Sequence, residues 1–385
     1  MIKKSLTLIF ILFCFCGFSQ KTIQKKIESV TLKTTRNIKI YIPEGYEKDS
    51  IKNYPLTIVL DEEYLFDMYV GNSILFAKKD KAPKQIIVGI SMEQTKVQDI
   101  SFDVNTGRLT SSARGFYEFI RDDILIYMES NYRTSPFISL VGYGYSANLI
   151  THFLQEDAAF INSFICINPN FSDTIEQELI SYNLPKFTKE DNTFYFYSNN
   201  SSSFLLTKQQ KIDKVQKGLS SLELKNFNVI NDVMITSSSV SAISEAIPRA
   251  LTYIFEVYSG ISNEEFEKNI KDLAPRDAIY YLENKYLEIE FLFGTNLGIR
   301  ERDIYAIENI IIEKENGDYL RDFGKMILKL FPSSPIGDYY IGKYYEIGKV
   351  YKKALKYYKI GYGKMDPSDP NADAFYENIL RLGGQ

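Results

Sequence analysis

Apolar and polar positions divide the chain into two parts with different patterns. Before about residue 258, runs such as 54–61, 85–90 and 161–167 are almost wholly apolar, which is typical of strands buried on both faces. Between such runs, 116–131 and 244–258 repeat apolar residues at helical spacing. Strands that alternate with helices predict the α/β class, with a mostly parallel sheet covered by helices on both faces.

Near the start of this first part, residues 29–42 alternate between polar and apolar side chains. A period of two is typical of strands that bury one face. The pattern predicts a β-hairpin whose turn is Thr34-Thr35-Arg36-Asn37.

From residue 259 to residue 385 the patterns are helical only, so we expect a second, all-α domain after an α/β domain at 21–258. The stretch 335–367 reads as a helical hairpin. Its spacing is close to the tetratricopeptide pattern at Ile341-Gly342-Lys343-Tyr344-Tyr345, Ala354, Tyr358 and Asp366-Pro367. One repeat cannot bury a face alone, so the helices at 275–293 and 302–331 must stack on it. The sequence is compatible with two interpretations of these helices, a tetratricopeptide-like module and a generic helical cap on the first domain.

Residues 1–20 have the pattern of a signal peptide. Lys3 and Lys4 precede an apolar run at 6–15 that is too short to span a bilayer comfortably, and small residues at 17–19 suit a cleavage site. The segment predicts a secreted or periplasmic protein. A lipoprotein is disfavoured because phenylalanine, not a small residue, precedes Cys14 and Cys16.

Composition narrows the function classes. The net charge of −4 and the pI near 5.5 do not indicate the positively charged surface that binds nucleic acid. Cys166 is the single cysteine after the signal segment, so no intrachain disulfide is expected. No second apolar run is long enough to span a membrane, and no Cys/His spacing or glycine-rich phosphate loop predicts a metal or another cofactor.

The chemically informative stretch follows an apolar strand at 137–141. It contains Gly142, Tyr143, Gly144, Tyr145 and Ser146 and leads into a helix. Strand, tight glycine turn and helix are the context of a hydrolase nucleophile elbow, G-x-S-x-G. If Gly142 is its first glycine, the nucleophile position is Gly144. If Ser146 is the nucleophile, the elbow lies two residues further from the strand. The sequence leaves both registers open.

Residues from about 24 to 256 resemble the esterase family of α/β-hydrolases that includes enterochelin-esterase-like and esterase-D-like proteins. The matching pieces occur in the family's order and are Ile40-Tyr41-Ile42-Pro43-Glu44-Gly45-Tyr46, Tyr54-Pro55 to Leu60-Asp61, Ile86-Ile87-Val88-Gly89-Ile90, Phe119 to Tyr132, Ile165-Cys166-Ile167-Asn168-Pro169-Asn170 and Ala246-Ile247-Pro248-Arg249-Ala250-Leu251. The resemblance implies an α/β-hydrolase fold and an ester-hydrolysing triad of serine, histidine and an acid.

The chain departs from this family at the catalytic positions. On its elbow, G-H-S-x-G-G, the histidine becomes Tyr143 and the nucleophilic serine becomes Gly144. The family's catalytic histidine corresponds to a position near Ser239. The acid is expected after a late strand, where no carboxylate follows until Asp213. The catalytic motif is therefore degenerate.

A serine needs a base to take its proton. His152 is the only histidine in the chain and lies six residues after Ser146 on the same predicted helix. Six residues turn a helix by about 240° and raise it by about 9 Å, so the two side chains point apart. A lysine base would need burial to lower its pKa, and no lysine neighbours the elbow in sequence. We expect no working triad.

The remaining candidates concern ligand binding. Asp61, Glu62 and Glu63 are consecutive carboxylates, and their alternating directions favour a solvated loop over a metal site. Asp61, Glu62, Tyr145 and Ser146 are nevertheless candidates to line the former active-site cleft.

Three hypotheses follow. The first is an esterase-family protein without catalysis, which binds a small acyl or glycan ligand in the former cleft and a protein partner through the C-terminal helices. The second is an active carboxylic-ester hydrolase with a non-standard site around Ser146. The third is a structural component of the cell envelope.

Overall fold

The structure is a computed structural model. The residues it describes are 21–155, 160–175, 177, 179, 193–235, 238–294, 297–315, 317–366 and 368–383. The predicted signal peptide, Thr236 and Ser237 just before Ser239, and Pro367 of the tetratricopeptide pattern lie outside them.

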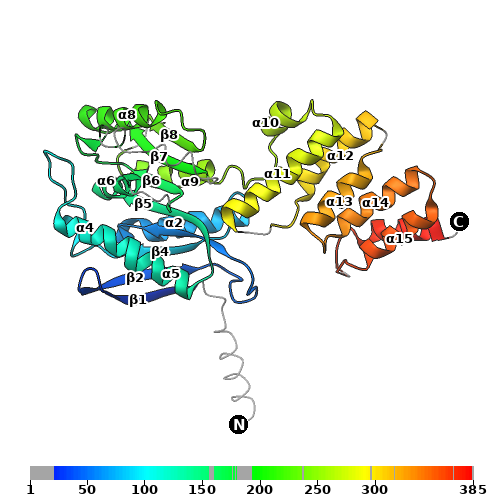
Figure 1. The fold of residues 1–385 in the computed structure, drawn as a ribbon, viewed down its shortest axis with the longest axis horizontal. Helices are drawn as coiled ribbons and strands as arrows, with labels where there is room; N and C mark the ends of the chain where they lie inside the picture. The colour runs from blue at the N-terminus through cyan, green and yellow to red at the C-terminus, as the bar shows by residue number, and fades with distance from the viewer. Residues whose placement is uncertain are drawn as a thin grey trace, which may run out of the picture. The chain divides into compact units, whose positions relative to one another are not determined.

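An eight-stranded sheet organises the first part of the chain, in the order β1-β2-β4-β3-β5-β6-β7-β8 (Figure 1). β1 and β2 pair antiparallel, β2 pairs antiparallel with β4, and the six strands from β4 to β8 in this order are parallel. The strands are β1 (Lys21–Ser29), β2 (Thr34–Ile42), β3 (Tyr54–Val59), β4 (Ile86–Ile90), β5 (Thr134–Tyr143), β6 (Ser163–Ile167), β7 (Phe194–Ser201) and β8 (Phe227–Met234).

Burial explains why the central strands read as continuous apolar runs. Every residue of β3, β4 and β6 is buried, because helices cover both faces of a parallel sheet. The connecting elements are α2 (Glu62–Lys78), α3 (Lys96–Asp99), α4 (Ser111–Glu118), η1 (Phe119–Ile124), α5 (Leu125–Asn131), α6 (Tyr145–Thr151), η2 (His152–Gln155), α8 (Leu206–Ser220) and α9 (Ser241–Ile254). The predicted α/β class, with a mostly parallel sheet flanked by helices, is confirmed.

The N-terminal hairpin differs from the prediction in its turn. β1 and β2 are joined by residues 30–33, with Ser29 opposite Thr34, so Thr34 to Asn37 belong to a strand. Lys33 takes a left-handed conformation, φ +53°, that closes the connection. The prediction was wrong because most side chains of β1 are polar, and the strand was therefore not recognised from hydrophobic periodicity.

The contacts of the chain separate into two units. The first consists of 1–78 and 84–253, and the second of 79–83 and 254–385. The second unit is helical where the structure describes it, with α10 (Asn263–Glu265), η4 (Phe266–Ile270), α11 (Pro275–Phe293), α12 (Glu301–Glu315), α13 (Leu320–Leu330), α14 (Pro335–Ile347), α15 (Tyr351–Tyr362) and α16 (Ala372–Gly383).

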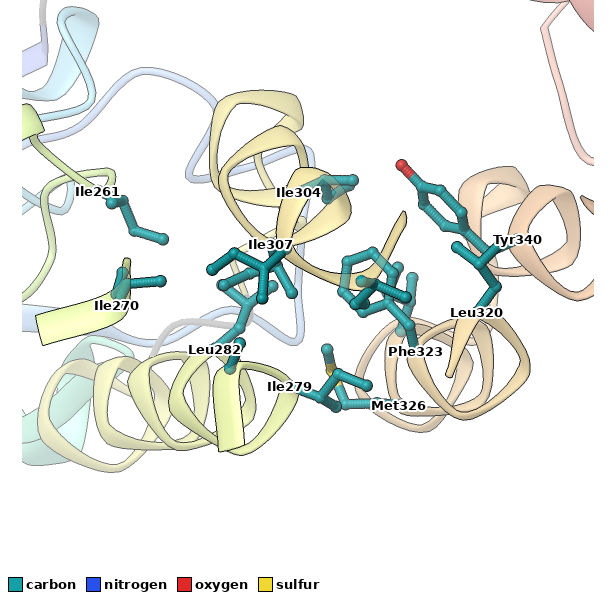
Figure 2. Close-up of a cluster of buried hydrophobic side chains, with 14 of the residues drawn as sticks. Ile261, Ile270, Ile279, Leu282, Ile304, Ile307, Leu320, Phe323, Met326 and Tyr340 are labelled. Atoms are coloured by element: carbon teal, nitrogen blue, oxygen red, sulfur yellow. The ribbon is translucent and has the colours of Figure 1, made fainter. Parts of the chain in front are cut away.

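The helical unit has its own apolar core (Figure 2). Leu282 of α11, Ile307 of α12 and Phe323 of α13 are fully buried and point toward one another. Tyr340 of α14 extends the core, with its ring 4.9 Å from that of Phe323. Each helix contributes an apolar stripe that a neighbour covers, as the helical spacing requires.

The predicted hairpin at 335–367 is formed by α14 and α15. A Cβ built on Gly342 would lie 2.7 Å from a ring carbon of Tyr358, so a glycine is needed where the two helices touch. The assignment of this hairpin to the tetratricopeptide class stays a prediction. Within the described part of the chain, each helix is too short or too polar to cross a membrane.

Candidate functional site

The turn between β5 and α6 is centred on Gly144. Its φ of +60° and ψ of −117° lie in a region that side chains other than glycine rarely adopt. Two residues earlier, a Cβ built on Gly142 would lie 2.7 Å from the carbonyl carbon of Ser146, so strand and helix can approach this closely only at a glycine. Of the two registers that the sequence allowed, the one from Gly142 to Gly144 matches the strained turn.

Ser146 lies inside the first turn of α6. It is fully buried, and its hydroxyl has no hydrogen-bond partner among the described residues. The neighbouring Tyr145 is 48% exposed, and its ring centre lies 6.1 Å from that of Phe102. The structure therefore places Tyr145 at the surface beside the turn and Ser146 beneath it.

A Cβ on Gly144 itself would meet little. Its nearest neighbour would be Nδ2 of Asn170 at 3.6 Å, an ordinary contact distance. The Gly144 N–H donates to the carbonyl of Ile167 at 3.0 Å, and its own carbonyl accepts from the Asn170 N–H at 2.9 Å. The loop after β6 is thus fastened to both sides of the turn, while the space for a side chain stays open.

The acidic residues after β3 do not form a solvated loop. Asp61 is fully buried with φ +56°, accepts a hydrogen bond from the Tyr143 N–H at 3.2 Å and forms an ion pair with Lys96. Glu62 begins α2, is buried and forms an ion pair with Lys39 of β2. The expectation of solvation was wrong for both, because they lie at the start of α2 (Asp61 just before it) and face lysines from distant segments.

Glu63 is exposed but has three partners. Its Oε1 accepts hydrogen bonds from the Ser91 hydroxyl and from the N–H groups of Met92 and Glu93, at 2.8, 2.9 and 2.8 Å. Partial burial disfavours the charged carboxylate, yet the hydrogen bonds outweigh it and hold the pKa of Glu63 below its usual value. This carboxylate caps a loop and is not free to bind a ligand.

Lys96 lies between two aromatic rings beside the turn. Its amine is 5.5 Å from the ring centre of Tyr64 and 5.6 Å from that of Tyr143. Together with its ion pair to Asp61, these contacts hold the lysine in place. Asp61, Tyr143 and Lys96 therefore form one connected cluster on the β3 side of Gly144.

On the other side of Gly144, the ends of β6 and β7 are joined by two asparagines. The Asn168 N–H donates to Oδ1 of Asn199 at 2.7 Å, and Nδ2 of Asn199 donates to Oδ1 of Asn168 at 2.7 Å. Nδ2 of Asn168 donates to the carbonyl of Ser239 at 2.7 Å. Ser239, the position matched to the family's histidine, contributes a backbone carbonyl to this network, and Asn199 stands near the end of the strand after which the acid was expected.

Lys208 in the first turn of α8 completes this side. Its amine donates to the carbonyl of Asn168 at 2.8 Å and lies 4.2 Å from the ring centre of Phe204. Burial lowers the pKa of Lys208 to about 8. Sequence reasoning missed this residue. Lys208 is 64 positions from the turn, and only the fold brings the two near each other.

The remaining candidate side chains, His152, Cys166 and Asp213, are buried or partly buried and have partners within the protein. His152 begins η2, directly after the helix that carries Ser146, and is 6% exposed. Burial raises the pKa of the Cys166 thiol, which donates weakly to the Ala147 carbonyl. Asp213 accepts hydrogen bonds from the side chains of Asn200 and Asn231 at 2.9 and 3.1 Å. Across the described ranges, no three His, Cys, Asp or Glu side chains gather as a metal site would require.

The chain resembles several solved structures. An uncharacterised protein from Capnocytophaga ochracea matches with a TM-score of 0.82 and 21% identity, over 95% of this chain and 100% of the other. An IroE-like serine hydrolase from Shewanella oneidensis matches with a TM-score of 0.57 and 18% identity, over 80% of this chain and 98% of the other. The BES protein from Bacillus cereus matches with a TM-score of 0.53 and 16% identity, over 62% of this chain and 97% of the other.

No protein-family model matches the sequence. A search of curated proteins gave no match either. At these identities the structural likeness establishes the fold. The first part of the chain has the α/β-hydrolase fold of esterase-like proteins, as the resemblance in the sequence predicted.

Proposed function

We propose that this chain is an exported protein of the esterase-like α/β-hydrolase fold that has lost hydrolysis and binds ligands instead. The observation that carries the proposal is Gly144 at the strained turn. In this fold class the strained turn presents the nucleophile at the end of the central strand. A glycine there offers no group that could attack an ester.

The described residues around the turn support the loss of catalysis, because the candidate bases among them are buried or hydrogen-bonded to the protein. A base acts within about 2.6–3.2 Å of the proton it takes. His152 is buried after α6, and the amine of Lys208 donates to a backbone carbonyl. On the two sides of Gly144, the polar groups of Asp61 and of the Asn168–Asn199 pair are bonded to protein partners.

The residues at this edge of the sheet are better suited to binding a small ligand than to catalysing a reaction. A Cβ at Gly144 would fit without a clash, since its nearest neighbouring atom would lie at 3.6 Å. Tyr145 and Phe102 present aromatic rings beside it. Such rings pack against the apolar face of a sugar or against an acyl chain, so we infer a small acyl or glycan ligand.

The other parts of the proposal rest on the sequence. Residues 1–20 direct export to the periplasm or beyond, and the C-terminal helices contact a protein partner as a tetratricopeptide-like module. The helical unit has a buried core of its own, so it can present a surface without help from the sheet.

A serine-reactive fluorophosphonate probe tests the loss of catalysis. We expect the purified wild-type protein to stay unlabelled and to leave p-nitrophenyl acetate and butyrate intact. Gly144→Ser should also stay unlabelled, because the new hydroxyl has no base. It should lower the free energy of unfolding by about 1–3 kcal/mol, because serine disfavours this backbone conformation.

The competing hypothesis, an active site around Ser146, makes the opposite prediction. Labelling of the wild-type protein that disappears in Ser146→Ala would establish it and overturn the proposal. Thr151→Ala is a matched control, because it removes another buried hydroxyl from the same helix. Labelling lost in both variants would indicate a folding defect, which circular dichroism detects.

A further inference from the structure

The exposed face of α15 carries an uncompensated row of lysines. Residues 349–364 include six lysines and no Asp or Glu, in a chain whose net charge is −4. Within α15, Lys352, Lys356 and Lys359 recur at spacings of four and three residues, so they share one face of the helix. All three are exposed, as are Lys353 beside them and Lys349 just before the helix. We call these five residues the lysine face.

Two acidic side chains of α14 already have partners within the chain. Glu346 of α14 pairs with Arg381 at 2.5 Å and accepts the Tyr358 hydroxyl at 2.8 Å. Asp338 of α14 pairs with Lys364 at 2.6 Å. Within 317–366 and 368–383, no ion pair joins a residue of the lysine face to a carboxylate. The positive charge of the face is therefore available to a partner.

Tyrosines border the lysine face. Tyr351 and Tyr362 are about 40% exposed, and Tyr362 lies 5.9 Å from the ring centre of Tyr376 on α16. On the other border Tyr357 stacks on Tyr345 at 5.7 Å. Ile360, between the borders, is 39% exposed. Lysines beside partly exposed tyrosines are typical of surfaces that meet lipid headgroups.

We propose that the lysine face docks on an anionic lipid surface. Lysine is a flexible point charge without the planar fork that binds single carboxylates in fixed geometry, so a row of lysines suits a broad field of phosphates. Along α15 the row spans about 10 Å from Lys352 to Lys359, enough for more than one headgroup. The inference holds whether or not the sheet domain hydrolyses esters.

Vesicle co-sedimentation of residues 21–385 tests this. That form contains every described residue and omits the apolar run at 6–15, which could bind a bilayer by itself. We expect binding to phosphatidylcholine vesicles that contain a quarter phosphatidylglycerol, and much weaker binding to pure phosphatidylcholine. Binding should fall as salt rises from 50 to 300 mM, because exposed charges are screened.

Variants assign the binding to the face. Replacing Lys352, Lys356 and Lys359 together by glutamine should weaken partitioning onto the anionic vesicles about a hundredfold, given the contribution of each lysine near such a surface. Replacing the same three by arginine should retain it. The matched control replaces three exposed lysines of the first unit, Lys26, Lys217 and Lys225, by glutamine and should change partitioning only a few-fold.

The result that overturns the proposal is equal partitioning of the glutamine triple variant and the wild-type protein, with circular dichroism confirming that both are folded. Equal binding to pure phosphatidylcholine would do the same. An oligoglutamate peptide is the third arm. If it binds the wild-type protein and the anionic vesicles do not, the face recognises an acidic peptide and the lipid proposal is wrong.

Discussion

The buried polar groups on the two sides of the Gly144 turn are paired in different ways. On the β3 side, the buried Asp61 forms an ion pair with Lys96, whose side chain is 32% exposed. On the β6 and β7 side, Asn168 and Asn199 carry no charge and exchange two hydrogen bonds. On both sides, therefore, these polar groups are paired with other groups of the protein. A catalytic site instead keeps a titratable group available for a substrate.

The largest effect is expected on the charged side. Lys96→Met leaves the fully buried Asp61 without its cation, and removal of one partner of a buried pair costs about 3 kcal/mol or more of unfolding free energy. Urea denaturation measures the loss. The double variant Asp61→Asn/Lys96→Met should recover part of it, because the stranded charge is gone. A single variant within 0.5 kcal/mol of wild type would show that the pair contributes little.

A charge placed on the neutral side should cost somewhat less. Asn199→Asp keeps the oxygen that accepts a hydrogen bond from the Asn168 N–H. It replaces the amide group that donates to Oδ1 of Asn168 with a second oxygen, which can only accept. We expect a loss of about 2 kcal/mol at pH 7, because a buried carboxylate oxygen then faces Oδ1 of Asn168 without a hydrogen bond between them.

The pH dependence of this variant identifies the cause. Burial raises the pKa of such a carboxyl group in the folded state, so the folded protein holds its proton where the unfolded chain has released it. Stability relative to wild type should therefore fall as pH rises above about 4. A loss that is constant between pH 4 and pH 8 would point to altered packing instead. Asn199→Leu, which adds no charge, is the control.

The smallest effect is expected at Lys208, the cation of the neutral side. Burial lowers its pKa to about 8 in the folded protein, against about 10.5 in an unfolded chain. Between these pH values the unfolded chain binds more protons, so this lysine makes the folded state more stable as pH rises. The difference in unfolding free energy between wild type and Lys208→Met should shift in favour of wild type from pH 8 to pH 10.

Lys217→Met is the matched control for the loss of a lysine from α8, because it lies on the exposed side of the same helix. A difference between wild type and Lys208→Met that does not vary with pH would contradict the burial of this amine in solution.

Much of the fold could be predicted because its signals are local. Apolar runs such as Ile86–Ile90 mark buried strands, and the glycines of the β5–α6 turn mark a sharp reversal at which only glycine fits. The hairpin turn was misplaced because β1 is largely polar and its pairing with β2 is a contact between strands. Hydrophobic periodicity shows which side of an element faces the core. Because β1 lies at the sheet edge and is largely polar, this signal is weak there.

The candidate site was predictable only in part, for a related reason. The missing serine and the isolated His152 are visible in the printed residues. The partners of Asp61 and Glu62 are not, because Lys96 and Lys39 lie 35 and 23 positions away and are brought near by the sheet. Consecutive carboxylates read as a solvated loop when those partners are unknown.

By itself, the sequence determined the α/β pattern, the all-helical end of the chain and the presence of a single histidine that points away from Ser146, since each depends on residue identity or short-range spacing. Only the tertiary structure decided that Gly144 occupies the strained position, that Ser146 is buried and that Asn168, Asn199 and Lys208 meet at one edge of the sheet. These facts depend on the order and register of strands far apart in the chain, which hydrogen bonds between strands fix and local propensities do not.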